Sequence, residues 1–75
     1  MLAGERFLIT RLAYNGSGNV EYMGQAAPGC TESEAAWLIK KITYDGSQNP
    51  VTIQFAGSQA LFDQVWSDRA SLSYG

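Results

Sequence analysis

The stretch from Leu8 to Asn19, LITRLAYNGSGN, recurs thirty residues later as LIKKITYDGSQN between Leu38 and Asn49. Six of the twelve paired positions are identical, and four more are close in chemistry or size. A valine follows each copy, Val20 directly and Val51 after one inserted residue, Pro50. In both copies an apolar segment runs into a Tyr-[Asn/Asp]-Gly-Ser turn and a second strand leaves it, which is typical of a β-hairpin. The repeat therefore predicts a fold built from two similar hairpins.

The two hairpins are expected over residues 7–25 and 37–56 of a single domain that spans residues 1–75. Apolar and polar residues alternate cleanly between 51 and 55, as in a strand with one buried face. The strand from Trp37 to Tyr44 carries apolar residues on both faces, so we expect it at the centre of the sheet. Between the hairpins, Thr31 and Glu34 have the spacing of a capping box, and we expect a loop or a single turn there.

Beyond the second hairpin the periodicity changes from two residues to a helical spacing. An apolar stripe begins at Leu61, and Ser58 stands where a helix cap would be, so we predict a short helix at about 58–67. Alternation of Ala70, Leu72 and Tyr74 with serines predicts a last strand at about 69–74. The expected class is α+β: a small antiparallel sheet of two similar hairpins plus a final strand, with one short helix packed on it.

Composition argues against several function classes. The chain has 75 residues, a net charge of −2 and a sequence pI near 4.7, which disfavours a nucleic-acid partner. Only 16% of residues are charged, whereas about 25% is usual. This is compatible with a surface buried against a partner and with an ordinary neutral surface. A small β domain has a thin stability margin, so we expect a homo-oligomer or many copies in one particle.

No residue pattern indicates a metal, a cofactor or a catalytic centre. Cys30 is the single cysteine and there is no histidine, so a disulfide, a zinc site and an activated thiolate are all disfavoured. The seven carboxylates form no obvious pair. The segment from Asp45 to Asn49 lacks the spacing and terminal Glu of a calcium loop, and turn-forming residues are the better interpretation. We therefore expect no enzyme activity and no cofactor.

The aromatic residues allow two interpretations. A stacking platform for sugars or single strands would use the tyrosines and tryptophans, but it would need basic neighbours, which are scarce. Trp37 and Trp66 are instead expected in the core. Tyr14 and Tyr44 precede the two turns and are expected to pack on their own hairpins.

Two further segments carry a resemblance to a known group of proteins. WLIKKITYDGS (residues 37–47) and VWSDRASLSY (residues 65–74) resemble motifs of a family of small, mostly uncharacterised proteins of tailed bacteriophages. The resemblance extends from the first Tyr-x-Gly-x-Gly turn to the tyrosine near the C-terminus. Such proteins are often encoded among structural genes, so the resemblance implies a virion component. It implies no particular catalytic or binding residues.

Together these features predict a non-enzymatic virion protein, either a capsid decoration, a head–tail connector or a tail component, that docks on other phage structural proteins. We expect no nucleic-acid or membrane partner, no signal peptide and no membrane span, and a place in the virion after synthesis in the host cytoplasm. The alternatives are a cytosolic phage inhibitor of a host protein and a host-surface or carbohydrate-binding module. The predicted partner contacts are the two turns: Tyr14, Asn15, Ser17, Asn19, Tyr44, Asp45, Ser47, Gln48 and Asn49.

Overall fold

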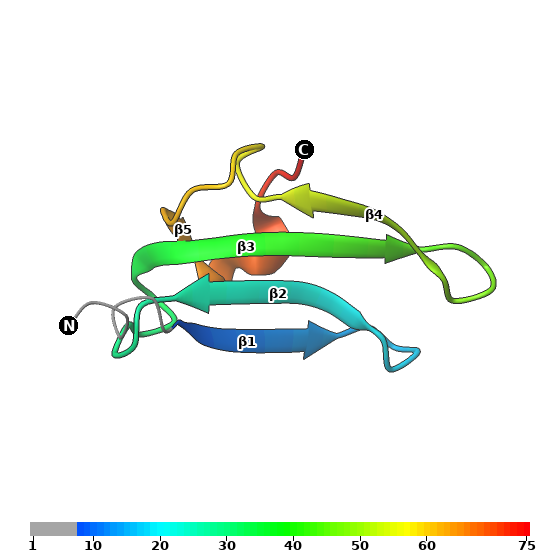
Figure 1. Cartoon of the computed structure of the whole chain (residues 1–75), viewed down its shortest axis with the longest axis horizontal. Helices are drawn as coiled ribbons and strands as arrows, with labels where there is room; N and C mark the ends of the chain where they lie inside the picture. The colour runs from blue at the N-terminus through cyan, green and yellow to red at the C-terminus, as the bar shows by residue number, and fades with distance from the viewer. Residues whose placement is uncertain (1–7) are drawn as a thin grey trace.

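The computed structural model describes residues 8–75, and this part of the chain is mostly β-structure. Four antiparallel strands lie side by side in the order β1-β2-β3-β4, and β5 pairs with the beginning of β3 (Figure 1). The two expected hairpins and their antiparallel sheet are confirmed, with β3 at the centre; Phe7 lies outside the described residues. The elements are β1 (Ile9–Tyr14), β2 (Val20–Ala26), β3 (Ala35–Tyr44), β4 (Pro50–Phe55), β5 (Gln64–Val65) and the 3₁₀ helix η2 (Trp66–Ser71).

The sequence repeat is also a structural repeat, with a constant period of thirty residues. Each hairpin has the same register and the same irregularity before its turn, as two matched sets of pairs show: Ala13–Tyr22 and Tyr14–Val20 in the first, Thr43–Thr52 and Tyr44–Pro50 in the second. Pro50 therefore occupies the place of Val20, and Val51 occupies that of the bulged residue Glu21. Pro50 is not an insertion, although the positions of the two valines suggest one.

The core lies on one face of the sheet, between the strands and η2. Gly24 is opposite Ile39 in the register, and the rings of Trp37 and Trp66 lie 5.9 Å apart between centroids. A Cβ atom added to Gly24 would lie 2.5 Å from the ring of Trp66, so only glycine lets η2 approach this closely. Both tryptophans are buried, as predicted. The buried apolar residues are Ala26, Trp37, Ile39, Ala56 and Trp66.

The helix predicted at about 58–67 is wrong, and with only the short η2 as helix the described chain is mostly β-structure and not clearly α+β. Gly57 and Ser58 both have positive φ, 74° and 63°, and the Ser58 amide donates to the carbonyl of Phe55. These angles make a tight turn, whereas a helix cap needs extended backbone. Leu61 and Phe62 then stay 47% and 49% exposed. Beyond the second hairpin, helical structure begins only at η2, because the residues just before it, Gln64 and Val65, pair with β3.

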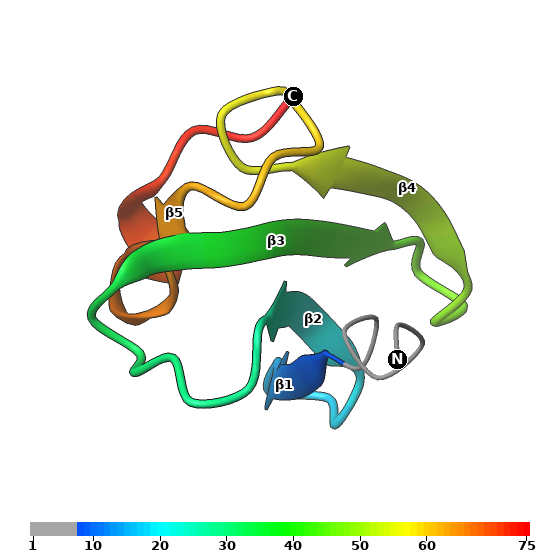
Figure 2. The ribbon, with the colours of Figure 1, turned by 60° about the vertical axis from the view of Figure 1, so that its left-hand side comes forward.

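The last strand predicted at about 69–74 is reduced to a single bridge. The chain remains in η2 as far as Ser71, and only Tyr74 pairs with Ala56 at the end of β4. In addition, the Gly75 amide donates to the Phe55 carbonyl, and the Phe55 amide donates to the Gly75 carbonyl. Figure 2 shows β5 and η2 at one end of β3, with the C-terminal segment beside the end of β4.

The segment between the hairpins is a loop, one of the two expected forms, and it contains two tight turns, closed by the Cys30 amide on the Ala27 carbonyl and by the Glu34 amide on the Thr31 carbonyl. The Thr31 amide donates to Oε1 of Glu34 at 2.7 Å, which is one half of a capping box. Strand β3 starts directly afterwards at Ala35, two residues earlier than predicted. The indole Nε1 of Trp37 donates to the Thr31 carbonyl, so this turn is fastened to the core.

The described part of the chain is elongated. Its principal extents are 45 × 23 × 20 Å and its radius of gyration is 13.1 Å, compared with about 11 Å for a compact chain of this length. Both hairpin loops project at the same end of the long axis, away from η2 (Figure 1). Among residues 8–75, no helix has the length and apolar character that crossing a bilayer requires.

Candidate functional site

The loop of the first hairpin is held by the side chain of Asn15. Its Oδ1 accepts hydrogen bonds from the amide of Ser17 at 2.9 Å and from the amide of Asn19 at 3.0 Å. Gly18 has a φ of 84°, a left-handed conformation that glycine adopts without a steric penalty. The short polar side chain thus satisfies the amides that the turn leaves without strand partners.

The loop of the second hairpin has the same geometry with Asp45 in the place of Asn15. Its Oδ1 accepts from the amides of Ser47 at 2.9 Å and Asn49 at 3.0 Å. The amide of Asn49 is the largest influence that lowers the pKa of the Asp45 carboxyl below 3.8, with the Ser47 amide adding to it and partial desolvation opposing it. Gln48 takes the position of Gly18 and also has positive φ, 69°.

Two contacts fasten the hairpins to one another at this end. The Asn19 side-chain amide donates to Oε1 of Gln48, which joins the two loops. The hydroxyl of Tyr44 donates to the carbonyl of Val20 at 2.6 Å. Tyr44 therefore contacts the neighbouring hairpin through its hydroxyl, a contact that the sequence did not predict. The two loops form a single surface.

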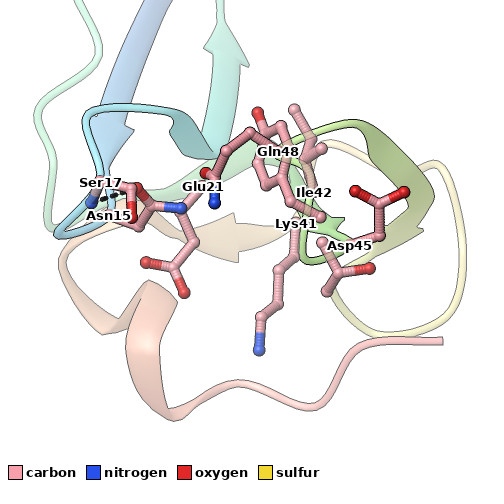
Figure 3. A pocket seen from close by; sticks show the side chains of 9 residues that line it. Asn15, Ser17, Glu21, Lys41, Ile42, Asp45 and Gln48 are labelled. Atoms are coloured by element: carbon pink, nitrogen blue, oxygen red, sulfur yellow. Dashed lines mark hydrogen bonds between the residues drawn. The ribbon is translucent and has the colours of Figure 1, made fainter.

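A polar hollow of about 370 Å³ lies between the loops. Figure 3 shows that its walls come from both hairpins, with Asn15, Ser17 and Glu21 from the first and Lys41, Asp45 and Gln48 from the second. We call this hollow the tip groove. Its lining residues are Asn15, Ser17, Glu21, Lys41, Ile42, Thr43, Tyr44, Asp45 and Gln48.

The structure brings five of the nine predicted contact residues into the tip groove, and the other four do not line it. Tyr14 is 59% exposed, so at most a part of its side chain packs on its own hairpin. Asn19 joins the loops from outside the groove, and Ser47 and Asn49 serve the second loop through their amides. Asn15 and Asp45 line the groove, but their Oδ1 atoms are engaged in holding the loops.

Sequence reasoning missed four lining residues: Glu21, Lys41, Ile42 and Thr43. Lys41 and Thr43 alternate along β3, so their presence on one face was readable once the strand was assigned. Glu21 is the bulged residue of β2, and no alternation pattern predicts the direction of a bulged side chain.

Aromatic rings support the groove from the side of η2. The Lys41 ammonium lies 6.0 Å from the ring centroid of Tyr22 and 5.8 Å from that of Tyr74, within cation–π range. The Tyr74 hydroxyl donates to the Arg69 carbonyl at 2.7 Å. Burial is the main cause that raises the pKa of Tyr74 to about 12, and the neighbouring Tyr22 adds to it. The groove thus contains one cationic residue, Lys41, and two anionic residues, Glu21 and Asp45. The rings of two tyrosines lie close to the lysine.

No protein-family model matches this chain, and no curated protein and no solved structure matches it.

Proposed function

We propose that this chain is a non-enzymatic docking subunit of a tailed-bacteriophage virion, present in many copies in the capsid, the head–tail connector or the tail. The observation that carries the proposal is the pair of hairpin loops. They share one geometry, lie side by side and project together from the end of the molecule that is farthest from η2.

Loops ordered in advance suit a docking role. Association costs free energy for every loop that must be fixed, and these loops are already held by Asn15, Asp45 and the Asn19–Gln48 contact. The groove between them offers polar and charged side chains that can set orientation. Tyr14, which precedes the first loop, is an exposed aromatic residue, a type enriched at protein interfaces.

The virion setting is supported by the resemblance of residues 37–47 and 65–74 to small tailed-phage proteins. The low charged fraction of 16% is compatible with a surface that is largely covered in an assembly. Symmetric assemblies present the same contact many times, so a weak contact at each tip suffices.

Quantitative mass spectrometry of purified particles of the encoding phage tests the setting. We expect the chain in a fixed stoichiometry of many copies per particle, and the copy number will distinguish capsid, connector and tail. Expression in infected cells without incorporation into particles would exclude the virion role.

Incorporation of a groove variant tests the contact. Ser17→Arg places a long charged side chain in the tip groove and leaves the loop hydrogen bonds of Asn15 intact. We expect reduced incorporation, because the partner would have to displace that side chain. Gln59→Arg adds the same charged side chain at an exposed loop position outside the groove and should be incorporated normally. Equal incorporation of both variants would show that the tip groove is not the contact.

A further inference from the structure

The face of the sheet opposite η2 carries an apolar surface. Side chains alternate along a strand, and directly paired residues share a face. Because Gly24 and Ile39 face η2, the residues flanking them face the other way. In Figure 1 this side of the sheet is toward the viewer, with η2 behind the strands. The register assigns six apolar side chains to it, which we call the open face: Leu12, Met23, Leu38, Ile42, Ile53 and Phe55.

The open face is exposed most on its two outer strands. Leu12 of β1 is 44% exposed and Ile53 of β4 is 58% exposed, while the other four side chains are partly buried. Within residues 8–75, the single helix packs on the opposite face, against Gly24 and Trp37. Large contiguous apolar patches are rare on monomers and mark binding surfaces.

An apolar hollow extends this surface at the end of the sheet far from the loops. It has a volume of about 310 Å³ and is lined by Leu8, Ala27, Cys30, Ala36 and Phe62. Leu8 is 41% exposed and Phe62 is 49% exposed. Alternation along β3 places Ala36 on the same side as Leu38. The apolar surface therefore continues along β3 from Leu38 through Ala36 into this hollow, while the polar pair of Thr10 and Gln25 separates the hollow from Leu12 and Met23.

This side of the molecule is large enough to contain a standard interface. The extents of the whole molecule, 45 × 23 Å, enclose on the order of 1,000 Å², of which the open face is a part, and a standard protein interface buries about 800 Å² on each partner.

The charge distribution favours a second copy as the occupant. In the described strands, Lys40 is the only charged residue that the register places among the open-face side chains. Its ammonium lies 5.6 Å from the ring centroid of Phe55, where a cation–π contact partly compensates the charge. A strongly charged partner would find little to pair with here. An identical face carries the same apolar rows and little charge to repel its copy.

We propose that two copies of this chain stack open face against open face as a two-fold β-sandwich. The sheets would lie about 10 Å apart, at the angle of roughly 30° that twisted sheets adopt. Leu12, Ile42 and Ile53 of each copy would interdigitate with those of the other. Lys41 and Thr43 face the opposite side, so these two groove residues stay accessible in the stack, whereas Ile42 of the groove lies in the interface. This inference deepens the proposed docking function and rests on it for its biological setting.

Sedimentation velocity of the purified chain tests the stack, from low micromolar to several hundred micromolar protein. We expect a monomer–dimer equilibrium that high salt does not weaken, because the interface is apolar. Ile53→Lys and Leu12→Lys should each raise the dissociation constant at least ~10-fold, since each places an unpaired charge in the interface. Thr52→Lys is the matched control, because it is exposed on the same strand but faces the other way.

Near-ultraviolet circular dichroism of Trp37 and Trp66 would verify that each variant is folded. A monomer at all concentrations would overturn the stack, and so would a Thr52→Lys variant that dissociates as readily as Ile53→Lys. The virion measurement is independent of this result. A monomeric protein found in particles would overturn the stack alone, whereas a dimer absent from particles would overturn the virion role alone.

Discussion

At the scale of single residues, Gly24 determines how closely η2 approaches the sheet. The space that a side chain would need at this position is filled by the ring of Trp66, which itself packs on Trp37. Arg69 covers the outer side of the same ring at 4.6 Å from its centroid. The packing of the small core thus depends on the absence of a side chain at Gly24.

Gly24→Ala is expected to destabilise the protein by about 1–3 kcal/mol, because the added methyl group forces Trp66 away from the sheet. The measurement is urea unfolding followed by tryptophan fluorescence. Gly46→Ala is the control, since a Cβ atom there meets nothing within 4 Å. Equal stability of the two variants would show that Trp66 moves without cost.

Asp45 is expected to make the second loop sensitive to acid. Its pKa is lower in the folded than in the unfolded chain, so its stabilising effect is complete above the unfolded pKa and is lost as the pH falls through the folded pKa. Asp45→Asn introduces the residue type that holds the first loop, where it is Asn15. We therefore expect the second loop to keep its structure in this variant and to lose no stability through this residue as the pH falls.

Carbon-13 NMR titration of the Asp45 carboxyl should give a midpoint below 3.8. Unfolding curves of the native chain and Asp45→Asn, compared across the acid range, isolate this residue from the other carboxylates. Parallel pH profiles for the two proteins would contradict the prediction.

At the scale of elements, the two hairpins use one loop design with different residues at two positions, Asn15 or Asp45 at the first and Gly18 or Gln48 at the fourth. Gly18 and Gln48 both adopt positive φ, at 84° and 69°. A residue with a Cβ atom is disfavoured in this conformation. The second hairpin accepts that strain at Gln48, whose side chain then receives the hydrogen bond from Asn19.

Gly18→Ala is expected to cost about 1 kcal/mol of stability, because alanine must adopt the left-handed conformation. Gly16→Ala is the matched control in the same loop. Neither position has an atom within 4 Å of an added Cβ, but only Gly18 has positive φ. Thermal unfolding of both variants measures the difference. Similar losses in both would show that backbone strain is not the cause.

At the scale of the whole molecule, few interactions besides strand pairing hold the hairpins together at the loop end. The Tyr44 hydroxyl and the Asn19–Gln48 contact cross the boundary between the hairpins there. The buried core lies toward η2, so the projecting ends depend on such polar contacts. Their alignment creates the tip groove.

Tyr44→Phe is expected to lower stability by about 1–2 kcal/mol, because the partly buried Val20 carbonyl loses its donor. Tyr14→Phe is the matched control, since Tyr14 is its repeat counterpart on the edge strand and is 59% exposed. Hydrogen exchange at the hairpin ends should also accelerate in Tyr44→Phe alone. Identical behaviour of the two variants would show that the contact between the Tyr44 hydroxyl and the Val20 carbonyl does not align the hairpins.

Most of the strands and both turns could be predicted from the sequence, whereas only part of the candidate site could be predicted in this way. Tyr44, Asp45 and Gln48 were correctly placed at a common surface, because a hairpin brings its turn residues to one end. Glu21 was missed because a bulge reverses the direction that alternation predicts. The exposed position of Tyr14 was missed because the first strand is at the edge of the described sheet.

The sequence by itself determined the hairpins, their turns and the burial of both tryptophans, since alternation and turn chemistry act over a few neighbouring residues. Tertiary structure alone decided the rest. The apolar stripe at Leu61 did not form a helix, because a tight turn at Gly57 and Ser58 and pairing with β3 claimed that segment. The open face and the tip groove likewise exist only once the strands pair, because each combines residues distant in the chain.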